Sequence, residues 1–276
     1  MTDIPELARE RLARPRPLPG LYSGNVRAVF ERGLKAIASQ NWTIVVSGFF
    51  EPVLYLLAMG LGVGALVGQV SGPGGVPTSY VAYLAPALLA TSAMNGAIYD
   101  STWNVFWKLR YARLYETMLQ ASLGPLDVAL GEILLALLRG ALYSSGFLCV
   151  LAAMGLVTSW WALLMVPCAL LIALGFAALG MGVTSLVTSF QQMDLVNFAM
   201  LPMFLFSATL YPITVFPSAI QWIIMALPLW HGVELMRHLA VGHAEALTAV
   251  HAAYFVGMTA LGLVFTTLRL RTLFLR

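Results

Sequence analysis

The chain contains few charged residues and almost no lysine. Asp, Glu, Lys and Arg make up 10% of its 276 residues, and its two lysines are Lys35 and Lys108. Hydrophobic residues make up 60% and the mean hydropathy is +0.84, values that lie far outside the range of water-soluble domains. The composition therefore excludes a soluble globular protein, because a water-soluble core cannot hide so much apolar surface.

The scarcity of lysine also excludes a common nucleotide site. A P-loop needs a lysine directly after a glycine, in the pattern G-x-x-x-x-G-K-[ST], to hold phosphates. Lys35 follows Leu34 and Lys108 follows Trp107, so this chain cannot hydrolyse ATP by that route. No Ser/His/Asp or Cys/His arrangement has supporting context either, and we predict no enzyme active site.

Six apolar stretches are long enough to cross a bilayer. A transmembrane helix needs about 20 residues to cross about 30 Å of hydrocarbon. The predicted spans cover 43–67, 81–106, 128–154, 160–187, 195–213 and 250–268. The predicted fold class is therefore all-α, a polytopic membrane protein with six transmembrane helices.

The distribution of basic residues predicts the orientation. Thirteen of the 15 Lys and Arg residues lie in 1–42, in 107–127 and in the C-terminal tail, whereas 68–80 and 155–159 carry no charge. Cytoplasmic loops of membrane proteins are enriched in Lys and Arg, so both termini are predicted to be cytosolic. Two cytosolic termini require an even number of spans, which agrees with six.

Three segments are predicted to lie outside these spans. Residues 1–20 combine four prolines with arginines and are predicted to form a disordered cytosolic tail. Residues 21–42 carry apolar side chains at helical spacing opposite charged ones, which predicts an interfacial helix in the headgroup plane. Residues 208–249 contain three prolines and a strongly apolar run, which predicts one or two re-entrant outer helices before the last span.

Four ionisable side chains fall within the predicted spans, namely Glu51, Asp100, Glu132 and Arg139. Charge at that depth is costly and marks a functional candidate. Glu132 and Arg139 are seven residues apart, so they share one helix face and can serve a common polar seam. The alternative is that Glu132 lies at the cytosolic end of its span and reaches water. Glu51 precedes Pro52, which frees a backbone carbonyl, and a proton-coupled carrier would use such an acid.

A polar pattern in the outer segment resembles a metal site. His231, Glu234 and His238 are spaced so that one helical face can present all three. The edge of a helix that faces the outer medium gives the same pattern, and we predict no metal.

The inner connection 107–132 mixes basic and aromatic residues and predicts a short amphipathic helix over 108–118. Such a helix suits docking into a groove on another protein. The residues predicted to make that contact are Lys108, Arg110, Tyr111, Arg113, Leu114, Tyr115 and Glu116.

Two long runs carry a family signature. They are YLAPALLATSAMNGAIYDSTWNVFWKLRYARLYETMLQASLGPLDVALGEILLALLRGALY (83–143) and FLFSATLYPITVFPSAIQWIIMALPLWHGVELMR (204–237). Together they resemble the permease subunits of ABC type-2 exporters, in particular those of lipo-oligosaccharide exporters, and the resemblance covers nearly the whole chain after residue 21. It implies a transmembrane domain over 43–276 in a bacterial cytoplasmic membrane, in which 108–118 is the coupling helix that contacts the ATPase.

The resemblance also implies partners and a substrate pathway. The chain would form a homodimer around a central pathway and pair with two copies of a separate ATP-binding subunit. ATP and Mg would be bound by that subunit, while this chain binds no cofactor and no nucleic acid. The pathway wall would come from the second and fifth spans, with Asn95, Tyr99, Phe204, Phe206 and Tyr211 as candidates. Their aromatic and amide groups suit an amphipathic substrate such as a lipo-oligosaccharide, polysaccharide or glycolipid, and equally a flat hydrophobic drug.

Three other functions are compatible with the residues. A drug or lipid efflux permease of the same family would use the same architecture. An ion-coupled secondary carrier would use Glu51, Asp100 or Glu132 and no ATPase. A membrane enzyme would be built on His231 and Glu234.

Overall fold

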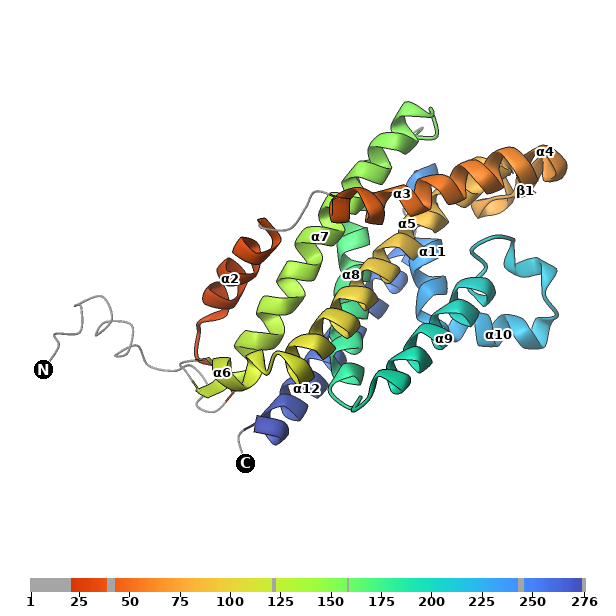
Figure 1. Ribbon diagram of the computed structural model, residues 1–276. Coiled ribbons are helices and arrows are strands. Elements are labelled where there is room, and N and C mark those ends of the chain that lie inside the picture. The colour runs from red at the N-terminus through yellow and green to blue at the C-terminus, as the bar shows by residue number, and fades with distance from the viewer. Residues whose placement is uncertain (1–20, 39–42, 121–122, 158, 243–245, 275–276) are drawn as a thin grey trace, which may run out of the picture.

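The computed structural model describes residues 21–38, 43–120, 123–157, 159–242 and 246–274, almost all of them in helices (Figure 1). The predicted tail over 1–20 lies outside the described residues. The α-helices are α2 (Val26–Ala38), α3 (Thr43–Leu57), α4 (Gly64–Val67), α5 (Tyr80–Tyr99), α6 (Leu114–Gln120), α7 (Pro125–Ala153), α8 (Met165–Thr184), α9 (Phe190–Phe206), α10 (Ser218–Ala226), α11 (Pro228–Val241) and α12 (Ala246–Phe274).

Wider or tighter helical turns extend several of these helices. The π-helical turns η1 (Ala58–Val63), η3 (Asp100–Asn104) and η4 (Trp107–Tyr111) join α3 to α4 and lengthen α5, while the 3-10 turn η5 (Trp160–Leu164) leads into α8. Two other 3-10 turns, η2 (Pro73–Gly75) and η6 (Ile213–Val215), lie in outer connections. Turns of the π type are rare and often occur at functional sites, and two of the three lie in the second span.

The helices confirm an all-α polytopic membrane protein. Five of them are long and apolar enough to cross a membrane, over Phe50–Val67, Tyr80–Tyr111, Pro125–Ala153, Trp160–Thr184 and Ala246–Leu273. The fifth predicted span corresponds to α9, whose 17 residues lie at the lower limit for crossing a bilayer. A count of six is reached if α9 crosses as well, or if the bent pair Ser218–Ala226 and Pro228–Val241 counts as one broken span.

The outer connections differ from plain loops. Residues Gln69–Ser71 (β1) and Pro77–Ser79 (β2) pair as a short antiparallel hairpin across the first outer connection. In the predicted re-entrant region, α10 and α11 form two short helices bent by 88°. Their place in the outer membrane half stays a prediction.

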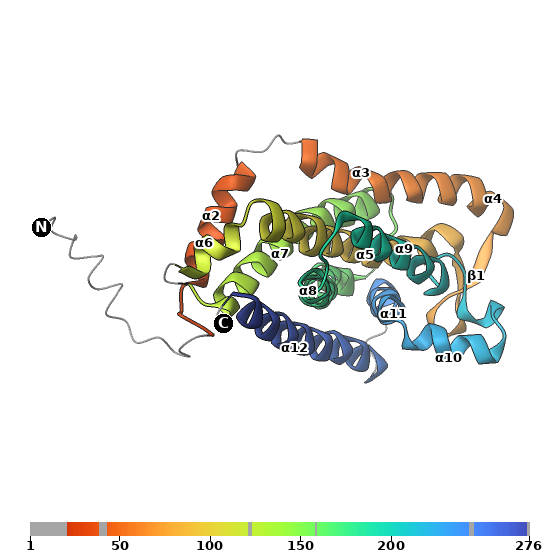
Figure 2. The same cartoon turned by 60° about the horizontal axis from the view of Figure 1, so that its bottom comes forward.

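Helix α8 lies at the centre of the bundle, with α5, α7, α11 and α12 packed around it (Figure 2). Small residues permit this close packing, because a side chain at Gly180 would collide with Ser101 and one at Gly262 would collide with the backbone of Ala178. The α8 residues Ala173, Ala177 and Ala178 are accordingly buried in the main core.

The first and last helices of the described chain meet at one end of the bundle, beside α6 (Figure 1). Val29 of α2, Tyr115 of α6 and Leu270 of α12 belong to one buried cluster there. We call this the inner end, because the basic segments predicted to be cytosolic gather at it. The cytosolic placement itself rests on the charge pattern.

Candidate functional site: a polar seam inside the bundle

Two buried ion pairs join the second span (Tyr80–Tyr111, which contains α5, η3 and η4) to α7. Arg139 of α7 donates to the Asp100 carboxylate over 2.5 Å, and Lys108 donates to the Glu132 carboxylate over 2.5 Å. The two carboxylates are almost inaccessible, with side-chain exposures of 7% for Asp100 and 4% for Glu132. We call these four residues the polar seam.

The register of the two helices explains the pairing. The second span and α7 follow one another and run in opposite directions. The eight-residue separation of Asp100 and Lys108 therefore matches the seven-residue separation of Glu132 and Arg139. On each helix the acid precedes the base along the chain, so the antiparallel arrangement places every acid opposite a base. Charges buried away from water are stable only when paired in this way.

The predicted polar face of α7 is thus present, and Glu132 and Arg139 both point towards the second span. The alternative, in which Glu132 simply reaches water at the membrane surface, is wrong because its carboxylate is buried and paired.

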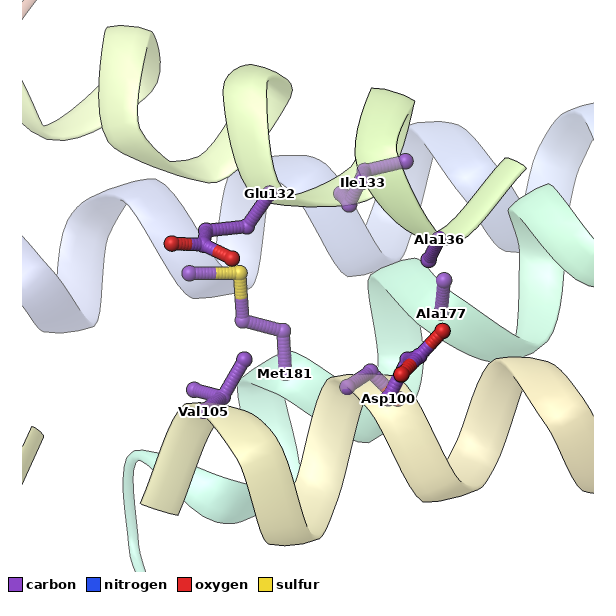
Figure 3. A pocket seen from close by; sticks show the side chains of 8 residues that line it. Asp100, Val105, Glu132, Ile133, Ala136, Ala177 and Met181 are labelled. Carbon is purple, nitrogen blue, oxygen red and sulfur yellow. The ribbon is translucent and has the colours of Figure 1, made fainter. Parts of the chain in front are cut away.

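A small cavity lies within the seam, with a volume of about 10 Å³ for a water molecule to occupy (Figure 3). The Asp100 and Glu132 carboxylates face it from opposite walls, and apolar side chains of α7 and α8 complete it. The Glu132 Oε1 atom is buried there with no hydrogen-bond partner among the described residues. The remaining lining comes from Ser101, Val105, Ile133, Ala136, Ala177 and Met181.

The predicted coupling helix over 108–118 is divided in two. Residues up to Tyr111 continue the second span as η4, and a separate helix α6 begins at Leu114. Between them Arg113 adopts a φ of 45°, in the left-handed region that interrupts a right-handed helix. No local pattern predicts this break, because residues in left-handed positions are usually Gly or Asn.

The predicted docking residues accordingly divide into exposed and buried groups. Arg110, Tyr111 and Arg113 are exposed at the inner end, whereas Leu114 and Glu116 are half-buried. Lys108 turns inward to the polar seam and is not available for docking. Tyr115 is likewise wrong as a docking residue because it is fully buried.

Tyr115 approaches the seam from α6. Its hydroxyl is buried with no hydrogen-bond partner among the described residues. Burial raises the pKa of this phenol well above its usual value, and the neighbouring Glu132 charge raises the pKa further. The Tyr115 hydroxyl therefore lies close enough to the Glu132 carboxylate for the charge of Glu132 to act on it. The charge of Glu132 thus acts on a side chain of α6, so α6 interacts electrostatically with the polar seam.

The Asp127 carboxylate fastens α2 to the start of α7. One carboxylate oxygen accepts from the backbone N–H groups of Ser23 (2.8 Å) and Gly124 (2.7 Å), and the other accepts from that of Asn25 (2.9 Å). The Leu126 N–H donates to the Leu21 carbonyl across the same contact. Sequence reasoning missed this clamp, because its partners lie more than 100 residues apart and its only local signal is an acid in the first turn of a helix.

A second group of buried polar contacts, separate from the polar seam, surrounds Arg237 near the outer end of the bundle. We call it the Arg237 centre. Arg237 is 2% exposed, and its guanidinium donates to the carbonyls of Ala208 (2.8 Å) and Thr209 (3.0 Å). It also pairs with Glu234 and lies over the Tyr83 ring, 3.7 Å from the ring centroid. A single side chain thus ties α11 to α5 and to the segment that follows α9.

The other predicted site residues lie apart from the seam. Glu51 is exposed on α3, and no described element brings it to the other intramembrane charges. The Nδ1 atom of His231 lies 2.8 Å from Nδ1 of His251, while His238 contacts Thr248. These histidines therefore connect α11 to α12.

The five predicted pathway residues are not gathered into a cavity within one chain. Tyr99 is 62% exposed and Phe206 is 47% exposed, while Asn95 is half-buried. Phe204 packs edge-on against Tyr55. The Tyr211 hydroxyl donates to the Leu205 carbonyl, which closes the turn after α9.

The sequence of the chain is similar to those of a known family of membrane proteins. Residues 24–241, which run from the start of α2 to the end of α11, match the family described as ABC-2 type transporter. The chain is also similar to nodulation protein J of Rhizobium leguminosarum. The bv. viciae protein is 33% identical over 82% of this chain and 86% of its own length, and the bv. trifolii protein is 34% identical over 82% and 84%. Nodulation protein J of Rhizobium meliloti (strain 1021) is 30% identical over 81% and 84%.

These matches confirm the resemblance on which the sequence interpretation was based. The matched segment contains the polar seam, the α6 helix and the Arg237 centre. The chain is a member of the ABC-2 type transporter family.

Proposed function

We propose that the chain is the permease subunit of an ATP-driven exporter that moves an amphipathic substrate out across the bacterial cytoplasmic membrane. Two copies would line the pathway, and two copies of a separate ATP-binding subunit would dock at the inner end. The family match over residues 24–241 carries this proposal. A lipo-oligosaccharide, polysaccharide or glycolipid is the proposed substrate class, with a drug or lipid as the alternative within the family.

The inner end has the features that docking of an ATPase requires. Arg110, Tyr111 and Arg113 are exposed beside α6, which offers a basic and aromatic surface to a partner. Tyr115 of α6 is buried and lies near Glu132 of the polar seam. Movement of α6 by a partner would therefore act on buried charges within the membrane domain.

The polar seam favours an exporter over an ion-coupled carrier. A carrier needs an acid that is free to exchange its proton or ion. Asp100 and Glu132 are each paired with a cation, and Glu51 is exposed on the outside of the bundle. Glu51→Gln is expected to leave ATP-driven transport intact, whereas a carrier based on Glu51 would lose coupling to the proton gradient.

Purification from the native membrane tests the proposal. The tagged chain is extracted in mild detergent, and the preparation is assayed for an associated ATPase and for vanadate-sensitive ATP hydrolysis. We expect a stoichiometric ATP-binding subunit. A chain that purifies alone and is indifferent to ATP would contradict the proposal and favour the carrier. The variant Arg113→Glu, which leaves Arg110 in place, should release the ATPase or uncouple its hydrolysis.

A further inference from the structure

Helix α9 is packed less tightly than the helices around it. Met193 is its one buried residue among 17, and Leu195, Phe198 and Leu201 are 58–71% exposed. The opposite stripe, including Val196 and Met200, is half-buried against the main core. Side-chain packing along α9 is therefore sparse, and the contacts at its two ends decide its position.

The outer end of α9 is held by Arg237, whose two bonds to the Ala208 and Thr209 carbonyls are buried. The left-handed backbone of Ala208, with a φ of 54°, turns these carbonyls towards the guanidinium. Arg237 is also paired with Glu234. An arginine with this many buried contacts is costly to detach.

The inner end of α9 is held by a second arginine. Arg110 donates from Nε (3.2 Å) and Nη2 (3.0 Å) to the carbonyl of Val187, three residues before the helix begins. The ring of Phe190, the first residue of α9, lies 5.2–6.1 Å from the rings of Tyr111, Phe106 and Trp103. We call these contacts the inner latch.

The two attachments differ in exposure and in position. Arg237 is buried, whereas Arg110, Tyr111 and Phe190 are exposed, so water can replace the Arg110 bonds to Val187 more easily than those of Arg237. Beneath the Arg110 bonds, Phe106, Val187 and Met193 form a small buried cluster. Arg110 lies on η4, and only Ala112 and Arg113 separate the end of η4 from the start of α6. A displacement of α6 would reach Arg110 through three residues of backbone, Tyr111 to Arg113.

We propose that Arg110 is a positioning residue that holds the inner end of α9 against the second span, and that movement of α6 during the ATPase cycle releases it. Arg237 stays in place and serves as the pivot at the outer end. Release would swing the inner half of α9 away from the second span and change the opening of the pathway on that side. The inference rests on the proposed function only for the cause of the movement, which is the ATPase cycle. The contacts of the latch do not depend on the proposed function.

A cysteine pair that flanks the latch measures its state. Ala112→Cys and Ser189→Cys are introduced with Cys149→Ser and Cys168→Ser, and a short bifunctional thiol reagent is added to the purified complex. Cross-links within one chain are separated from those between chains by mass on a denaturing gel. We expect efficient cross-linking without nucleotide and at least a fivefold lower yield in the vanadate-trapped state. Equal yields in the two states would overturn the release.

Arg110→Ala in the same background tests the positioning role separately. The nucleotide-free yield should fall at least threefold, while Arg110→Lys retains part of it. Arg271→Ala, which removes an exposed arginine of α12 at the same end, is the matched control and should leave the yield unchanged. Equal yields for Arg110→Ala and Arg271→Ala would overturn the role of Arg110. Failure of the proposed function gives a different result, a chain without an associated ATPase, and the Arg110 comparison still reports on the latch.

Discussion

The polar seam and α9 differ in where their polar contacts lie. The seam has them in the middle of the bundle, whereas α9 has them only at its two ends. Along the seam, two acids and two bases are paired inside the bundle, and large side chains such as Phe147 are fully buried further along α7. Along α9, the side chains are mostly exposed and the polar contacts lie only at the ends.

This difference separates the parts of the molecule that resist movement from the part that allows it. Interiors that are close-packed and ion-paired have few alternative arrangements. A helix with few buried side chains can change its tilt with less repacking than a fully buried helix. The seam is thus the fixed frame of the subunit, and α9 is the element that release of the proposed inner latch would allow to move.

The largest expected effect comes from breaking one pair of the seam. Arg139→Met leaves the Asp100 carboxylate buried without its cation, which typically costs about 3–5 kcal/mol of folding stability. Unfolding of the purified protein in lipid nanodiscs measures this loss. The double variant Asp100→Asn/Arg139→Met should recover most of it, because neither charge remains. A loss below about 1 kcal/mol for Arg139→Met would show that the seam is not a fixed frame.

A smaller effect is expected at the clamp that joins α2 to this frame. Asp127→Ala leaves three backbone N–H groups without their acceptor, and the unsatisfied groups should cost about 1–3 kcal/mol. Hydrogen exchange of residues 21–38 should become about tenfold faster or more, while exchange along α8 is unchanged. Glu116→Ala on α6 is the control. Unchanged exchange at Ser23 and Asn25 would contradict the clamp.

Tyr115→Phe should have little effect, even though Tyr115 is one of the largest fully buried residues. Its hydroxyl has no partner among the described residues, so its removal should change stability by less than about 1 kcal/mol and can increase it. Glu132→Gln in parallel removes the partner of Lys108 and should cost more. A greater loss for Tyr115→Phe than for Glu132→Gln would reveal a bound water between the two groups.

The smallest effect is expected on α9 itself. Phe198 is 71% exposed, so Phe198→Ala should change the stability of the isolated chain by no more than about 0.5 kcal/mol. Phe147→Ala in α7 is the matched control, and the loss of a fully buried ring should cost about 3–5 kcal/mol. Similar losses for the two variants would remove the contrast between α9 and the frame.

The sequence allowed prediction of three of the four seam residues, Asp100, Glu132 and Arg139, but not of the pairs that they form. Helical spacing placed Glu132 and Arg139 on one face, because a helix repeats every 3.6 residues whatever surrounds it. The partners on the second span depend on how two helices are aligned in space. Lys108 was therefore predicted to dock the ATPase, although the alignment turns it towards Glu132.

The span boundaries were predictable to within a few residues, whereas the inner connection was not. Apolar length is a property of local sequence, and five of the six predicted spans coincide with long apolar helices. The break at Arg113 depends on a backbone conformation that arginine rarely adopts, and the Asp127 clamp depends on a contact with residues 21–25. Both are consequences of tertiary packing, which local patterns do not encode.

The pairing within the polar seam also determines how the subunit responds to the membrane potential. An unpaired charge carried through the whole membrane field gains or loses about 2.3 kcal/mol for every 100 mV. The seam holds two positive and two negative groups, so its net charge is zero and its displacement as a unit does almost no electrical work. We therefore expect the charges of this fixed frame to add almost no voltage dependence to transport, whereas a single neutralising substitution such as Arg139→Met would leave a net charge on which the membrane field can act.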